Sequence, residues 1–332
     1  MRTIAIIGGG SWGTALALAA MRSRARHAVQ LWLREKDLAA RMQTSRENDL
    51  FLPGFPLPAE VEITDELARA VAGADVVVSV IPAQFLRRVW EELRPHLPPR
   101  AVVISATKGL ENETLFRPTE VIRQALGEAR PIAALSGPSF AREVAAGLPT
   151  AVVVATEDEA RARELQEELS GPTLRLYTNT DVAGVEIGGA VKNVIAIAAG
   201  VSDGLELGTN ARAALITRGL AEITRLAVAC GGRRETLAGL AGLGDLVLTC
   251  TGALSRNRSV GLELARGRRL EEIVGSMRMI AEGVETTRVT RALGRRLGVE
   301  LPITEQMCRM LFEGIAPSTA VRELMERALK EE

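Results

Sequence analysis

The sequence is poor in the two side chains that most often bind metals or transfer protons. It contains only two histidines, His27 and His96, and three cysteines, Cys230, Cys250 and Cys308. None of them has zinc-ligand spacing, and an odd number of scattered cysteines does not suggest a disulfide framework. We therefore expect no metal site, and a reducing compartment, the cytoplasm, as the place of action.

An excess of either charge and a long apolar run are also absent. The 41 Lys and Arg residues are balanced by 41 Asp and Glu residues, so the formal net charge is zero. Nucleic-acid-binding domains usually carry a basic excess, so we expect no nucleic-acid partner. The apolar stretch Ile4–Ile7 ends at three glycines and is too short for a signal peptide. No run of about 18 apolar residues follows, and we expect no membrane insertion.

The composition is that of an ordinary globular protein, and the length favours two domains. The chain has 332 residues, of which 47% are hydrophobic and 25% are charged. Its first part alternates short β-branched runs with helical patterns, which predicts a mostly parallel α/β sheet. The expected strands are Thr3–Ile7, Ala28–Leu33, Val76–Ile81, Ala101–Ala106, Ile132–Ser136, Thr150–Ala155 and Thr173–Tyr177. The expected helices between them are Trp12–Met21, Asp65–Val71, Ala83–Leu93, Pro118–Leu126, Phe140–Ala146 and Glu157–Leu169.

From about Asp181 the strand pattern stops, and the remaining sequence has helical spacing with glycine punctuation. We therefore predict a dinucleotide-binding domain over residues 1–180 and an all-helical domain over residues 181–332. The expected helices of the second domain are Gly184–Ala199, Asn210–Cys230, Arg234–Leu240, Ser259–Arg266, Leu270–Val274, Thr286–Leu297, Thr304–Phe312 and Ser318–Leu329.

A glycine-rich segment after the first strand points to a dinucleotide. Residues 8–13 read GGGSWG, which fits G-x-G-x-x-G between a strand and a helix. Gly8 would permit the tight turn, Gly10 would let the backbone approach a pyrophosphate, and Gly13 would let helix pack on strand. Arg34 follows the second strand, about 20 residues after the glycines, where a guanidinium favours the 2′-phosphate of NADPH. Glu35 beside it keeps NADH as an alternative.

Reduction of a carbonyl needs a proton donor, and histidine, the usual source, is scarce in this sequence. We expect both histidines in surface loops, so lysines become the candidates. Lys108 follows the strand Ala101–Ala106, at the sheet edge where open α/β folds bind ligands. Lys192 stands in the small and apolar segment GGAVKNV, where burial would lower its pKa and let it act as acid or base. The alternative is that Lys192 extends to the surface.

Four further segments concentrate polar groups among small residues. The turn Ser136–Phe140 offers backbone N–H groups and a hydroxyl, or it is a plain capping turn. Asp245 could orient Lys192, bind a substrate hydroxyl, or only cap a helix. The residues around Arg256 could form an anion-binding site, or they could form a solvated loop. Glu282 precedes a helix, where a first-turn acid is common.

These motifs occur together in one order, and the chain resembles bacterial NAD(P)-dependent glycerol-3-phosphate dehydrogenases from Arg2 to about Glu326. The motifs are GGGSWGTA, ATKGL at 106–110, SGPSFA at 136–141, GGAVKNVIAI at 188–197, NARAALITRGLAE at 210–222, GLAGLGDLVLTC at 239–250, SRN at 255–257 and AEG at 281–283. The resemblance implies a Rossmann-like domain followed by a helical domain of the 6-phosphogluconate dehydrogenase C-terminal-like type. It also implies reversible reduction of dihydroxyacetone phosphate to sn-glycerol 3-phosphate for glycerophospholipid synthesis, and it favours a homodimer.

The resemblance also implies roles for individual residues, with Lys192 as the catalytic acid/base. Substrate contact is implied for Lys108, Gly137, Ser139, Lys192, Asp245, Ser255, Arg256 and Asn257. Cofactor contact is implied for Gly8, Gly10, Ser11, Trp12, Gly13, Arg34, Phe51, Lys108, Ala141, Arg256, Ile280 and Glu282. The chain departs from the family in the basic turn Arg22–Arg26 and at Leu33, where glycine is frequent; both departures are expected beside Arg34 and bear on cofactor preference.

Two other functions fit part of the pattern. A hydroxyacid or 6-phosphogluconate-type dehydrogenase would share the architecture and the Lys192–Asn193 pair, but would not explain GLGDLVLTC followed by SRN. A non-catalytic NADP(H) sensor would use the glycine-rich loop alone, and would have no need of Lys108 and Lys192 as proton donors.

Overall fold

The computed structural model describes residues 1–127, 130–277 and 281–329, and these form two compact units. Unit 1 comprises Met1–Lys108 and Phe116–Glu186, and unit 2 comprises Gly109–Leu115 and Ile187–Glu332. The sequence did not predict that residues 109–115 join the second unit. A domain boundary near residue 180 stays a prediction.

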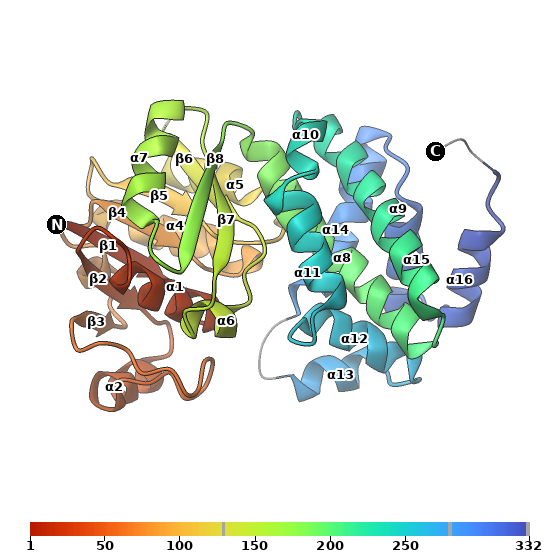
Figure 1. The fold of residues 1–332 in the computed structure, drawn as a ribbon, viewed down its shortest axis with the longest axis horizontal. Coiled ribbons are helices and arrows are strands. Elements are labelled where there is room, and N and C mark those ends of the chain that lie inside the picture. Colours follow the sequence, from red (N-terminus) through yellow and green to blue (C-terminus); the bar gives the residue numbers. More distant parts are fainter. Residues whose placement is uncertain (128–129, 278–280, 330–332) are drawn as a thin grey trace. The chain divides into compact units, whose positions relative to one another are not determined.

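Unit 1 is built on an eight-stranded sheet of order β3-β2-β1-β4-β5-β6-β7-β8 (Figure 1). All neighbouring strands are parallel except β6 and β7. The predicted Rossmann-like, mostly parallel sheet is therefore confirmed. The order reverses between β1 and β4, and open α/β sheets bind ligands at such a point, beyond the carboxyl ends of the strands. The strands are β1 (Arg2–Ile7), β2 (His27–Trp32), β3 (Val61–Thr64), β4 (Val76–Ser79), β5 (Val102–Ser105), β6 (Ile132–Ser136), β7 (Thr150–Ala155) and β8 (Leu174–Asn179).

The apolar runs of these strands are continuous because both faces of the sheet are covered. In β1, Ile4 and Ile6 belong to one buried cluster, whereas Ala5 and Ile7 belong to another on the opposite face. The helices of unit 1 are α1 (Ser11–Met21), α2 (Lys36–Ser45), α3 (Leu67–Ala70), α4 (Leu86–Leu93), α5 (Pro118–Leu126), α6 (Ala141–Ala145) and α7 (Glu159–Leu169), with short turns η1 (Ala83–Phe85) and η2 (Arg94–His96).

The structure corrects two expectations about the segment around β2. His27 is the first residue of β2 and is buried, with Nε2 2.9 Å from the carbonyl oxygen of Glu168, so it is not a surface-loop residue. The basic turn precedes β2 and Arg34 follows it, so the turn lies at the other end of that strand. Arg22 has a structural role there, because its guanidinium donates to the carbonyl oxygens of Val144 and Ala145 at the end of α6.

The described secondary structure of unit 2 consists of helices without strands, as predicted (Figure 1). Its helices are α8 (Val182–Gly204, beginning in unit 1), α9 (Gly208–Ala229), α10 (Arg234–Leu237), α11 (Asp245–Thr251), α12 (Arg256–Ala265), α13 (Leu270–Ser276), α14 (Glu282–Leu297), α15 (Pro302–Phe312) and α16 (Pro317–Met325), with a π-helical turn η3 (Leu240–Gly244) before α11. The central helix α8 is long and apolar enough to cross a membrane, yet 94% of its most apolar window is buried. That burial is the pattern of a core helix.

Helices α8 and α12 approach each other at glycines. A Cβ atom on Gly200 would lie 1.9 Å from the carbonyl oxygen of Arg258, and one on Gly261 would lie 1.9 Å from that of Ile197. Both distances are far below van der Waals contact, so neither position accepts a side chain without moving a helix. This close packing fixes the start of α12, where the SRN motif lies.

A buried carboxyl group in unit 2 makes stability depend on pH. Glu222 on α9 accepts hydrogen bonds from the first backbone N–H groups of α15, at Ile303 and Thr304, and from the Thr304 hydroxyl. Burial nevertheless raises the pKa of Glu222 to about 7. Because the folded state holds this proton more tightly, the stability it contributes is full below about pH 4.5 and is lost as pH rises through 7.

We expect the wild type to lose thermal stability relative to Glu222→Gln as pH rises from 5 to 8, by up to about 3 kcal/mol. The glutamine keeps an acceptor oxygen but cannot ionise. Melting both proteins by circular dichroism at half-unit pH steps measures the difference. A gap between the two melting temperatures that stays constant with pH would contradict this assignment.

Candidate active site

The predicted site residues fall into two groups, one in each unit, and the first is the glycine-rich loop. Gly8 has φ +122°, and a Cβ atom on it would lie 2.5 Å from the carbonyl oxygen of Val80. A Cβ atom on Gly13 would lie 1.8 Å from the carbonyl oxygen of Gly8, whereas one on Gly10 would meet nothing within 4 Å. The three positions therefore match a tight turn, a helix packed on a strand, and an open cradle at the start of α1. Such a cradle fits the pyrophosphate of a dinucleotide.

The helix that follows supplies the first two predicted contact residues. Ser11 and Trp12 are the first residues of α1, and the first N–H groups of a helix point along its axis, where they favour an anion. Gly9 is also constrained: a Cβ atom on it would lie 2.3 Å from Cγ of Leu33, so the leucine found where the family often has glycine packs directly on the loop.

Arg34 lies at the carboxyl end of β2 with its side chain 66% exposed. Its guanidinium lies 2.8 Å from a carboxylate oxygen of Glu35 and 5.7 Å from the ring centroid of Phe85. The charge that would bind a 2′-phosphate is thus present at the surface, but it is shared with a neighbouring acid. Phe51, in the loop between α2 and β3, is partly buried against the same core as β1.

Lys108 and the turn after β6 meet within unit 1. The Lys108 ammonium donates to the carbonyl oxygen of Gly137 at 3.2 Å, and the Ser139 hydroxyl donates to the same oxygen at 2.9 Å. Gly137 has φ +139°, which favours glycine. Ala141 opens α6 two residues further on, so this helix begins one residue later than predicted. The turn therefore gathers three predicted residues around one carbonyl group.

The second group is centred on Lys192, which is 5% exposed in the middle of α8. Its ammonium contacts the carboxylate of Asp245, which is fully buried, and donates to the Thr249 hydroxyl at 3.0 Å. That hydroxyl in turn donates to the backbone oxygen of Asp245 at 2.6 Å, so its lone pairs are available to the lysine. The surface alternative for Lys192 is wrong. Burial disfavours its charged form, but the carboxylate stabilises it, which the sequence argument from burial alone did not include.

The turn before α11 brings Asp245 to this lysine. Gly188 lies one turn before Lys192 on α8, and a Cβ atom there would lie 2.7 Å from the carbonyl oxygen of Ala241 in η3. The absence of a side chain lets η3 reach α8, and Asp245 follows directly as the first residue of α11. A π-helical turn is rare and is often found at functional sites.

The SRN motif forms the start of α12. Ser255 caps that helix, accepting a hydrogen bond from the N–H of Arg258 at 3.2 Å. Arg256 is exposed and Asn257 is buried. The side-chain oxygen of Asn257 accepts from the N–H of Gly283 at 3.0 Å, which links α12 to the first turn of α14. Glu282 begins α14, and Ile280 lies outside the described residues.

Sequence reasoning missed Thr249 as a partner of Lys192. Its only signal was its spacing, four residues after Asp245, which places both on one face of a helix. Cys250 beside it is fully buried, and burial raises the pKa of its thiol to about 12. The thiol therefore stays protonated and is not a nucleophile. No cluster of metal-ligating side chains occurs among the residues that the structure describes.

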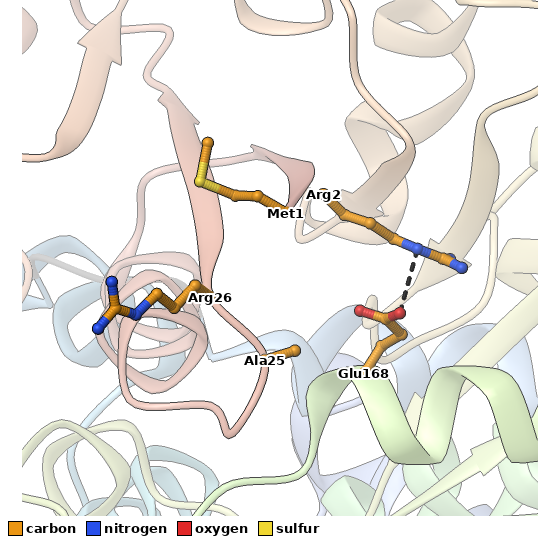
Figure 2. A pocket seen from close by; sticks show the side chains of 5 residues that line it. All are labelled: Met1, Arg2, Ala25, Arg26 and Glu168. Atoms are coloured by element: carbon orange, nitrogen blue, oxygen red, sulfur yellow. Dashed lines mark ion pairs between the residues drawn. The ribbon is translucent and has the colours of Figure 1, made fainter.

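A surface cavity of about 420 Å³ has no residue of the glycine-rich loop in its lining. Figure 2 shows the side chains that line it. Its lining residues are Met1, Arg2, Ala25, Arg26 and Glu168. They surround the amino-terminal ends of β1 and β2, roughly 20 Å from the opposite edge of the sheet. Arg2 lies 3.1 Å from Glu168 and 2.6 Å from Glu164, so its charge is already balanced. We do not include this cavity in the candidate site.

Comparison with known proteins gives a consistent result for both halves of the chain. Family models described as the NAD-dependent glycerol-3-phosphate dehydrogenase N-terminus and C-terminus match residues 3–162 and 181–322. Proteins named glycerol-3-phosphate dehydrogenase (NAD(P)+) from Koribacter versatilis and Syntrophotalea carbinolica are 56% and 55% identical, over 98% and 99% of both chains. The crystal structure of glycerol-3-phosphate dehydrogenase from Coxiella burnetii superposes with a TM-score of 0.93, at 43% identity, covering 98% of this chain and 99% of that one.

These matches decide between the alternatives left by the sequence. They support neither of the two rival functions, the hydroxyacid or 6-phosphogluconate-type dehydrogenase and the non-catalytic sensor. Both relatives match over nearly their full length, and both are named glycerol-3-phosphate dehydrogenase. The chain belongs to the NAD-dependent glycerol-3-phosphate dehydrogenase family.

Proposed function

We propose that this chain catalyses the reversible NAD(P)H-dependent reduction of dihydroxyacetone phosphate to sn-glycerol 3-phosphate, with Lys192 as the general acid. The family membership supports the reaction. The observation that carries the role of Lys192 is its burial on α8 with both Asp245 and Thr249 in contact. A buried ammonium oriented by two partners is a suitable proton donor to a developing alkoxide.

The nicotinamide cofactor, when bound, supplies the hydride that reduces the ketone carbon. The chain's own residues would hold the substrate and move the proton. An ammonium has three donor hydrogens, and Asp245 and Thr249 orient the Lys192 ammonium through two acceptors. In reduction, a proton of the Lys192 Nζ passes to the alkoxide oxygen. In oxidation, the neutral amine takes it back, and Asp245 stabilises the ammonium that results.

The remaining predicted residues would bind phosphate groups. Arg256 is exposed at the start of α12, where its guanidinium and the N–H groups of the first turn favour an anion. Asn257 uses its oxygen on Gly283, which leaves the NH₂ group as its donor toward a ligand. Binding energy from a phosphate distant from the carbonyl would position the reacting carbon. Lys108, held at Gly137, would add a positive charge on the cofactor side.

A direct assay tests the reaction. Mixing the protein with NADPH and dihydroxyacetone phosphate should consume NADPH, seen as loss of nicotinamide absorbance. Cofactor binding without turnover would instead favour a sensor, and turnover with a hydroxy acid alone would favour the rival dehydrogenase. Either result would overturn the proposed reaction.

We expect Arg34→Ala to raise the KM for NADPH by about tenfold and the KM for NADH by less than about twofold, because only NADPH carries a 2′-phosphate for the guanidinium. Steady-state kinetics with both cofactors measures the ratio. Arg41→Ala is the matched control, since Arg41 is also an exposed arginine, 3.2 Å from Asp49. Equal changes for both cofactors would remove Arg34 as the discriminating residue.

We also propose that the enzyme works as a homodimer and supplies glycerophospholipid synthesis. The dimer rests on the resemblance to the family, and unit 2 exposes single apolar side chains at Leu207, Val228, Leu243 and Val247. Light scattering on the purified protein would give the mass directly. The cytoplasmic location stays a prediction; the three cysteines are free thiols, consistent with a reducing compartment.

A further inference from the structure

Asn48 is a fully buried amide whose partners are all parts of the cofactor end. It lies in the loop after α2, with no exposed surface. Its side-chain nitrogen donates to the carbonyl oxygen of Gly9 and to the Thr14 hydroxyl, both at 2.8 Å. Its side-chain oxygen accepts from the N–H of Phe51 at 3.0 Å. One side chain thus joins the glycine-rich loop to the segment that carries Phe51.

The bond to Gly9 has a consequence for the next residue. A trans peptide unit is planar, with its C=O and N–H groups pointing in opposite directions. When Asn48 holds the Gly9 carbonyl, the N–H of Gly10, which belongs to the same peptide unit, is fixed in the opposite direction. That N–H stands at the start of α1, where helix N–H groups bind phosphate. Asn48 therefore sets the direction of a phosphate-binding donor that it does not touch.

The loop after α2, which carries Asn48, is held by several hydrogen bonds and buried side chains. The Gly54 N–H donates to the Glu47 carboxylate at 2.8 Å, and the Leu57 N–H donates to the backbone oxygen of Arg46 at 2.6 Å. Leu52 and Leu57 are buried in the same core as α1. Because the loop is held at several points, a side chain fixed to it can hold the glycine-rich loop in place.

We propose that Asn48 is a positioning residue for the cofactor, aligning the phosphate-binding donor at Gly10 with Phe51 in one geometry. This inference rests on the proposed use of the glycine-rich loop to bind NAD(P)H. Asn48 does not contact the reacting atoms in this account. It acts on the affinity for the pyrophosphate part of the cofactor, and leaves the chemical step to unit 2.

Asn48→Asp tests the link with almost no change of shape. The aspartate keeps an oxygen to accept from Phe51, but it places a second oxygen against the Gly9 carbonyl in place of a donor. We expect the KM for NADPH and its fluorescence-measured Kd to rise by about tenfold, with kcat at saturating NADPH within about twofold of wild type. The affinity for 2′-AMP, which has no pyrophosphate, should not change.

Thr14 provides a second variant in case a buried aspartate prevents folding. Thr14→Val removes the hydroxyl that accepts from Asn48 while conserving shape, and should weaken NADPH several-fold. Thr14→Ser restores the hydroxyl and should restore the affinity. Gln166→Ala is the matched control, because the Gln166 amide also donates to a backbone oxygen at 2.8 Å, that of Leu176, far along the sheet order from β1.

The outcomes separate this inference from the function on which it rests. Failure of the wild type to bind NADPH would overturn the proposed function. Wild-type binding together with unchanged NADPH affinity in Asn48→Asp and Thr14→Val would overturn the role of Asn48 alone. Parallel loss of 2′-AMP and NADPH binding would also overturn it, since general damage to unit 1 would then explain the effect.

Discussion

Lys192→Ala is expected to lower kcat by about 10²–10⁴-fold, because the developing alkoxide loses its proton donor. NADPH binding should persist, since the glycine-rich loop and Arg34 lie in unit 1 and Lys192 in unit 2. The measurement is steady-state turnover of dihydroxyacetone phosphate beside fluorescence titration of NADPH. The alanine also leaves space where the side chain stood, so a small amine such as ethylammonium should restore part of the activity.

A fully active Lys192→Ala variant would exclude the lysine as general acid. A variant that lost NADPH binding as well would point to structural damage rather than to the loss of a proton donor. Thr249→Val provides a graded comparison, because it removes one of the two groups that orient the ammonium and leaves the ammonium itself. Its kcat should fall between that of the wild type and that of Lys192→Ala.

The second large effect concerns the contribution of the ion pair between Lys192 and Asp245 to the stability of the protein. Removing one member of a buried ion pair leaves the other charge desolvated and uncompensated, which costs about 3–5 kcal/mol. Asp245→Asn and Lys192→Met should each lower the free energy of unfolding by about this amount, since both side chains are almost fully buried. The double variant leaves no buried charge and should recover most of the loss, although it will be inactive.

Urea titration of the wild type, both single variants and the double variant gives the four free energies of unfolding of a double-mutant cycle. Glu159→Gln is the control, because it breaks an exposed pair with Arg163 at 3.2 Å, and exposed pairs contribute less than about 1 kcal/mol. Strictly additive losses in the double variant would show that Lys192 and Asp245 do not stabilise each other.

Local patterns were enough to predict much of the fold. The first strand, the glycine turn and α1 follow from adjacent residues, since β-branched residues, three glycines and a small apolar helix succeed one another within 21 positions. Strand β3 escaped prediction because it has four residues between proline-rich and acidic segments. Helix α2 has a largely polar sequence, and only Leu38, Ala39 and Met42 are buried.

Contacts between distant residues were harder to predict. The sequence suggested Asp245 as a partner for Lys192, but the two lie 53 positions apart, and the segment between them includes a long helix and a π-helical turn that no local pattern specifies. Asn48 is 39 residues from Gly9, and nothing in its immediate sequence distinguishes it from a surface asparagine. Likewise, the burial of His27 depends on α7, far along the chain. Tertiary packing, which no single segment encodes, decided each of these.

The segment Gly109–Leu115 belongs to the helical unit although the chain on both sides of it belongs to the sheet unit. Leu110 packs in the core of the helical unit, and 0% of its surface is accessible to water. Asn112 bonds to Glu285, and Thr114 accepts from Arg296. A fragment that begins after the sheet would therefore lack Leu110, a part of the helical core. A fragment that ends there would keep the segment Gly109–Leu115 without the helices on which it packs. The two halves are not separable modules: dividing this gene at a single point yields two incomplete products, and coexpression or circular permutation must respect this interleaving.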